Sequence, residues 1–185
     1  IALIPLLSPS ILAAIALVYW FGNKGILKAL LFGHSIYGPI GIILASIYWT
    51  FPHALMILST SLSLSDSRLY EAAEVLKTSK LRAFLTITIP GARYGIISTT
   101  FVVFTQVFTD FGVPKVIGGN YNVLATDIYK EVVGMQNFQM GAVISLVLLI
   151  PAMVAFFIDQ YSRKKQISLL TLSLIHISEP TRHRG

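Results

Sequence analysis

The chain has 185 residues, of which 55% are hydrophobic and 12% are charged, and its mean hydropathy is +0.74. This balance excludes an ordinary soluble domain and predicts an all-α protein that crosses a membrane several times. The net charge of +6 does not indicate nucleic-acid binding, because the basic residues lie beside apolar stretches and not along one exposed face. Cysteine is absent, so a disulfide framework and a thiolate metal site are excluded.

Four apolar stretches are predicted to cross the membrane, since a helical span needs about 20 residues for a hydrocarbon layer of about 30 Å. They cover about residues 4–21, 39–62, 94–111 and 138–158. Pro52 and Pro151 lie inside two of these stretches. A proline removes one helical hydrogen bond, so we expect a kink at Pro52 unless neighbouring groups bind the freed carbonyl.

The basic residues predict the orientation of the spans, because short cytoplasmic links are enriched in lysine and arginine. The link between the second and third spans and the segment after the fourth span hold Arg68, Lys77, Lys80, Arg82, Arg93, Arg163, Lys164 and Lys165. The other two links hold Lys24, Lys28, Lys115 and Lys130. This bias places the link between the second and third spans in the cytoplasm, and residues 112–137 on the outer side.

The cytoplasmic link reads EAAEVLKTSKLRAFLTITIP over residues 71–90, and it contains two apolar stripes with helical spacing. The first stripe consists of Leu69, Ala72, Ala73 and Leu76, and the second of Leu81, Phe84, Leu85 and Thr88. The stripes are out of phase on one continuous helix, so the chain is predicted to turn within residues 77–79.

Capping residues set the expected ends of these two helices. Ser65 or Asp66 is placed to cap the first helix, and Thr78 or Ser79 the second. Pro90 is predicted to end the second helix, because the residue before a proline is pushed out of helical geometry. Such a pair of amphipathic helices suits either the lipid headgroups or a groove of a partner, and the pattern alone does not decide between them.

The motif in this link resembles the cytoplasmic EAA motif of permease subunits of bacterial binding-protein-dependent ABC importers. The matching residues are Glu71, Ala72, Ala73, Leu81, Phe84, Ile87, Ile89 and Pro90. The surrounding pattern of spans agrees from about Pro5 to Arg163. The resemblance implies a multi-pass protein of the bacterial cytoplasmic membrane, with a type I permease-like helical bundle and cytoplasmic coupling helices.

The resemblance also implies partners and roles for residues of this link. The expected partners are a cytoplasmic ATPase dimer that binds the ATP, a second permease subunit or half, a periplasmic solute-binding protein and the lipid bilayer. Glu71, Lys80 and Arg82 are then candidates for contacts at the rim of an ATPase cleft, and Ala72 and Ala73 for close approach of the ATPase. Pro90 anchors the coupling helix beneath the third span.

Lys77 departs from the pattern of the family, which usually has glycine at this place. Glycine suits a left-handed bend at the end of a helix, and a lysine there costs on the order of 1 kcal/mol. The bend is expected to persist, and the efficiency of coupling is the property that Lys77 puts in question.

The outer end of the third span holds the most polar residues of any span, Gln106, Thr109 and Asp110. Polar groups in a span usually face a cavity or another helix, so these residues are candidates for the translocation path. The alternative for Asp110 is a capping residue at the interface. Residues 109–130 resemble ferric iron and 2-aminoethylphosphonate permeases, which makes these two solutes the candidates.

The sequence has no phosphate-binding glycine loop with lysine, no cluster of metal ligands and no nucleophile beside a base. We therefore expect a transport subunit without a catalytic site, metal or cofactor of its own. An ion-driven secondary transporter, with proline-broken spans around a site at the midplane, is the alternative. It predicts transport that depends on an ion gradient and not on an ATPase.

The last residues are excluded from the predicted fold. Residues 172–182, LSLIHISEPTR, resemble the in-frame translation of a sequencing-library adaptor. We assign residues 1–166 to the transmembrane permease domain, leave residues 167–171 unassigned, and expect residues 172–185 to be a non-native tail. The permease domain is expected to be a fragment of a longer protein.

Overall fold

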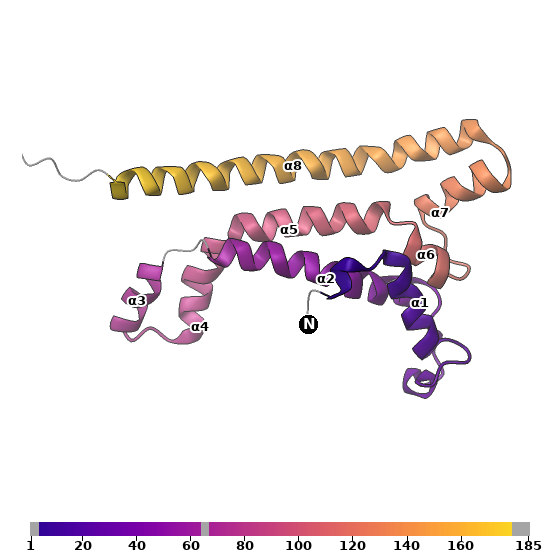
Figure 1. Cartoon of the computed structure of the whole chain (residues 1–185), viewed down its shortest axis with the longest axis horizontal. Helices are drawn as coiled ribbons and strands as arrows, with labels where there is room; N and C mark the ends of the chain where they lie inside the picture. Colours follow the sequence, from indigo (N-terminus) through magenta and orange to yellow (C-terminus); the bar gives the residue numbers. More distant parts are fainter. Residues whose placement is uncertain (1–3, 64–66, 179–185) are drawn as a thin grey trace, which may run out of the picture. The chain divides into compact units, whose positions relative to one another are not determined.

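The computed structural model describes residues 4–63 and 67–178, and these residues form helices and turns without a strand, as predicted (Figure 1). The elements are the 3-10 helices η1 (Ile4–Leu7) and η2 (Lys28–Leu31), the π-helices η3 (Phe84–Thr88) and η4 (Lys130–Gly134), and the α-helices α1 (Ser10–Phe21), α2 (Pro39–Ser63), α3 (Ser67–Val75), α4 (Lys80–Ala83), α5 (Ile89–Thr109), α6 (Gly112–Ile117), α7 (Leu124–Tyr129) and α8 (Phe138–Ser178). The predicted caps Ser65 and Asp66 lie outside the described residues.

Three helical segments are long and apolar enough to cross a membrane among the described residues: Pro39–Ser63, Lys80–Thr109 and Phe138–Lys164. They correspond to the second, third and fourth predicted spans. The third is longer at its start than predicted, because α4, η3 and α5 follow one another without a break. Helix α2 also continues through Pro52, whose side chain is buried.

The first predicted span is divided into η1 and α1, and α1 has only 12 residues. Pro9 explains the division, because its backbone is extended, with φ −61° and ψ 152°, and stands at the N-terminal end of α1. A proline is well suited to this place, since it has no N–H to leave unsatisfied. At 1.5 Å per residue α1 alone does not cross a hydrocarbon layer of about 30 Å.

The described chain separates into two compact units. The first unit takes its residues from 1–56 and 103–155. Its core consists of Ala14 from α1, Ile36 and Ala45 around the start of α2, and Val113 and Ile117 from α6. Gly38 lies beside this core with φ +107°, a left-handed backbone that favours glycine, and its N–H donates to the carbonyl of Ile117 at 2.8 Å.

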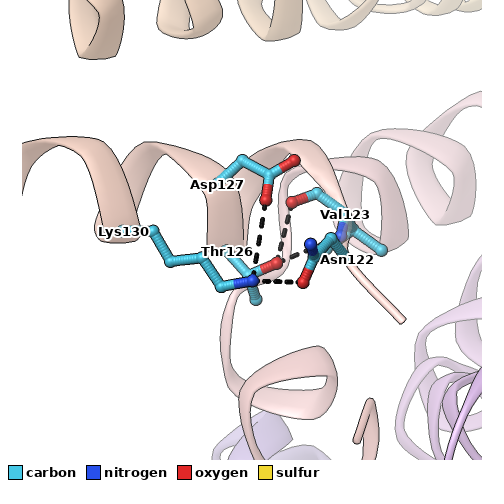
Figure 2. Close-up of polar contacts among 5 residues, drawn as sticks. All are labelled: Asn122, Val123, Thr126, Asp127 and Lys130. Atoms are coloured by element: carbon cyan, nitrogen blue, oxygen red, sulfur yellow. Dashed lines mark hydrogen bonds and ion pairs between the residues drawn. The ribbon is translucent and has the colours of Figure 1, made fainter. Parts of the chain in front are cut away.

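The segment between α6 and α8 contains the short helix α7. Polar side chains fix its start, as Figure 2 shows. Thr126 Oγ1 accepts from the N–H of Val123 at 3.0 Å and donates to the carbonyl of Val123 at 2.8 Å. The Lys130 ammonium donates to Asn122 Oδ1 and lies 4.0 Å from Asp127 Oδ1. These contacts give the segment a defined fold.

The second unit takes its residues from 57–102 and from 156 onward, and it contains the predicted cytoplasmic link. Its helices approach closely at Gly95 of α5, where an added Cβ would lie 2.2 Å from Ser61 Oγ of α2. Small residues allow such close packing between helices in a membrane. Ser98, one turn further along α5, donates from its hydroxyl to Asp159 Oδ1 of α8. Helix α5 therefore contacts both other long helices within this unit.

Candidate functional site

The predicted bend in the link lies where the sequence placed it. Helix α3 ends at Val75, α4 begins at Lys80, and Lys77 has a left-handed backbone with φ +51°. The N–H of Thr78 donates to the carbonyl of Ala73 at 2.9 Å, and the N–H of Lys77 donates to the carbonyl of Glu74 at 2.9 Å. This pair of bonds is the Schellman motif, which closes a helix at a residue that is usually glycine.

Two side-chain hydrogen bonds hold the helices on either side of this bend. Ser79, one of the two caps predicted for this helix, caps α4, because its Oγ accepts a hydrogen bond from the N–H of Arg82 at 3.3 Å. The Tyr70 hydroxyl of α3 donates to Thr88 Oγ1, at the end of η3, at 3.0 Å. The bond from Tyr70 to Thr88 joins residues 18 positions apart and fixes the two arms of the bend against each other.

The prediction that Pro90 ends the second helix is wrong. Ile89, directly before the proline, keeps right-handed helical angles of φ −64° and ψ −49°, and its N–H donates to the carbonyl of Phe84. That bond spans five residues, as in a π-helix, so η3 is wider than an α-helix. The wider turn moves aside the carbonyl that a proline ring would otherwise strike, and the chain changes direction without leaving helical geometry (Figure 1).

The apolar stripes of this pair of helices are largely uncovered by the described chain. Leu76 is 77% exposed and Leu81 is 69% exposed, and Leu69, Phe84 and Leu85 are each more than half exposed. The charged residues Glu71, Lys80 and Arg82 are exposed as well. The link thus presents large apolar side chains with charged residues beside them.

The two alanines of the motif differ in exposure. Ala72 is exposed, but Ala73 is only 8% exposed. Close approach of a partner at these two alanines stays a prediction, and of the two only Ala72 lies on the surface of the described chain. The Ala73 side chain is covered by other residues of the chain, and its carbonyl accepts the hydrogen bond from the N–H of Thr78 that closes the bend.

The three residues proposed for the path have different surroundings in the first unit. Asp110 stands before α6, where its Oδ2 accepts from the N–H of Val113 at 2.9 Å and its Oδ1 accepts from the Ser10 hydroxyl at 2.5 Å. This geometry fits the alternative interpretation of Asp110 as a cap. Thr109 donates to the carbonyl of Thr105 in its own helix at 2.7 Å. Gln106 has a buried Oε1 without a hydrogen-bond partner among the described residues.

Sequence patterns missed two sets of contacts. The bond from Tyr70 to Thr88 had no signal in the sequence, because it depends on the angle between two helices. The cluster of Ser98, Asp159 and Arg163 left a partial signal, since Asp159 and Arg163 are four residues apart on α8 and form an ion pair of 2.8 Å. Asp159 is 7% exposed and directly follows the fourth predicted span.

Comparison with known proteins gives the family of the chain. Residues 1–168 match the family described as "Binding-protein-dependent transport system inner membrane component". Two curated relatives are named as ferric transport system permeases: FbpB 1 of Haemophilus influenzae is 29% identical over 93% of this chain, and FbpB of Actinobacillus pleuropneumoniae is 28% identical over 93% of it. A third relative, the spermidine/putrescine transport system permease protein PotB of Escherichia coli, is 27% identical over 80% of this chain.

The chain spans only part of the length of these relatives. It covers 28% and 26% of the two ferric permeases and 57% of PotB. The family match nevertheless extends over most of the chain, including the link and all three long apolar helices. The chain therefore belongs to the family of inner membrane components of binding-protein-dependent transport systems.

Proposed function

We propose that this chain is part of the permease of an ATP-driven importer, and that α3, α4 and η3 seat in a cleft of a cytoplasmic ATPase. The observation that carries the proposal is the exposed apolar surface of the link, formed by Leu69, Leu76, Leu81, Phe84 and Leu85. An amphipathic helix with such a face fits a hydrophobic groove of a partner. Because the bend and the Tyr70–Thr88 bond fix its shape, the link loses little conformational freedom on docking.

The partners belong to the same proposal. ATP hydrolysis is assigned to a separate ATPase dimer, solute delivery to a periplasmic binding protein, and the remaining wall of the path to a second permease subunit or half. The family assignment supports this arrangement over an ion-driven secondary transporter. In the path itself, Gln106 has the strongest support, because its buried amide oxygen has no hydrogen-bond partner among the described residues, and such a buried group calls for an explanation.

Ferric iron is the solute that the relatives favour, since two of them are named as ferric permeases. The polyamine permeases among the relatives are similar at nearly the same identity. The family assignment therefore does not fix the solute, and we assign its selection to the periplasmic binding protein. No relative reported above carries a name that refers to 2-aminoethylphosphonate.

Chemical crosslinking tests the docking. A cysteine is placed at Leu76, which is exposed beside the bend, and not at buried Ala73. In the assembled transporter, a short thiol crosslinker should join Leu76→Cys to the ATPase subunit. The matched control is Met135→Cys, which is 71% exposed and lies in the segment predicted on the outer side, so it should give no such product. If the ATPase co-purifies but Leu76→Cys gives no crosslink, the docking proposal is wrong.

A further inference from the structure

The buried cluster of Ser98, Asp159 and Arg163 belongs to none of the roles assigned above. It joins the middle of α5 to the part of α8 that follows the fourth apolar stretch. The hydroxyl of Ser98 donates to Asp159 Oδ1, and Arg163 Nε donates to Asp159 Oδ2 at 2.8 Å. Both carboxylate oxygens are thus in use.

The burial of this acid shows that the cluster is more than a surface ion pair. Ser98 is 3% exposed and Asp159 is 7% exposed, whereas the side chain of Arg163 is 48% exposed. An ionised carboxylate at the edge of an apolar region is unfavourable unless hydrogen bonds compensate the lost hydration. The acid therefore favours arrangements in which Ser98 and Arg163 stay beside it.

The position of Ser98 connects this cluster to the bent link. Helix α5 is continuous with η3 and α4 through Pro90, and Ser98 lies eight residues beyond the proline, about 12 Å along the helix. The same buried side of α5 holds Ala92 and Gly95, and Gly95 meets Ser61 of α2. Ser98 is thus joined to α4 by one continuous helical backbone.

We propose that Ser98 and Asp159 are positioning residues that fasten α8 to α5, so that the bent link, α5 and α8 move as one body when the ATPase changes state. This inference rests on the proposed function, because it requires an ATPase that moves the link. Without the bond between Ser98 and Asp159, α8 is free to shift along α5, and the motion of the link no longer determines the position of α8.

A distance measurement in the assembled transporter tests this inference without reference to the solute. Spin labels are placed at Leu76→Cys and at Phe157→Cys, which is 62% exposed on α8, in a complex whose other accessible cysteines are replaced. We expect one narrow distance distribution that is the same without nucleotide and after trapping with ATP and vanadate. In Ser98→Ala the distribution should broaden and depend on the nucleotide state, while ATP hydrolysis stays within about two-fold of the parent.

Ser145→Ala is the matched control, because Ser145 Oγ donates at 2.8 Å to the carbonyl of Gly141 in its own helix and bonds to no second helix among the described residues. It should leave the distribution narrow. Asp159→Ser, which removes the acceptor of Ser98, is the second variant and should broaden it. Narrow distributions in both Ser98→Ala and Asp159→Ser, or a parent distance that changes with nucleotide, would overturn the inference. Since the crosslink from Leu76 reports docking separately, either result leaves the proposed function standing where that crosslink forms.

Discussion

Lys77 shows how far one residue determines the shape of the link. Its left-handed backbone allows the two hydrogen bonds of the Schellman motif, accepted by the carbonyls of Ala73 and Glu74, to close α3. A side chain with a Cβ is strained in this conformation by about 1 kcal/mol relative to glycine. The bonds at the bend, the Ser79 cap and the Tyr70–Thr88 contact offset this cost, so the bend is retained without the glycine.

Lys77→Gly should therefore stabilise the bend. We expect the amides of residues 76–78, which are hydrogen-bonded in the turn, to exchange with deuterium up to about five-fold more slowly, the equivalent of about 1 kcal/mol. Hydrogen exchange of the assembled transporter, followed by mass spectrometry, measures this change. Ala83→Gly is the control with the opposite sign, because Ala83 lies inside the continuous helix of α4 and η3, where a glycine costs about 1 kcal/mol relative to alanine. Faster exchange in Lys77→Gly would contradict a left-handed residue 77.

At the scale of elements, periodicity predicted the two short helices and the turn between them, because the phase of an apolar stripe follows from neighbouring residues alone. The fate of the helix at Pro90 was not predictable in this way. Local sequence rules give a proline one effect on the residue before it, but here the π turn of η3 accommodates the ring. The division of the first span at Pro9 was also missed. That span was predicted from hydropathy, and hydropathy stays high across Pro9 although the backbone there is not helical.

The continuity of α4, η3 and α5 gives a prediction of its own. Two glycines inserted between Thr88 and Ile89 should disconnect the link from α5, because each glycine disfavours the helix by about 1 kcal/mol and the insertion rotates the helices relative to each other. A fluorescent probe at Ile96→Cys, which is 40% exposed on α5, should then lose most of its response to ATP and vanadate.

Pro90→Ala is the control for this insertion, because alanine restores an N–H and retains the helix. Its response should match that of the parent. A full response in the insertion variant would mean that motion reaches α5 by another route, and the continuous backbone would lose its role.

At the scale of the whole molecule, the sequence predicted the family, the helical fold and the three long apolar helices of the described residues, since these follow from composition and from one motif. The buried contact of Ser98 with Asp159 could not be predicted, because it depends on the packing of residues 61 positions apart. Nor do the sequence patterns near Asp110 settle its role, since a carboxylate that caps α6 and one that faces a path occupy the same place in the chain.

The distribution of basic residues predicts how the chain lies in the membrane. Because the link between α2 and α5 carries more lysine and arginine than the segment between α5 and α8, the link is predicted to lie in the cytoplasm. An impermeant thiol reagent added to spheroplasts should therefore modify Met135→Cys and leave Leu76→Cys unmodified, although both positions are more than 70% exposed. Permeabilised cells, in which both cysteines should react, control for local accessibility when no partner covers Leu76. Modification of Leu76→Cys from outside would place the link away from any ATPase, because ATP hydrolysis in such a system takes place in the cytoplasm. The exposed apolar surface of α3 and α4 would then need a different partner.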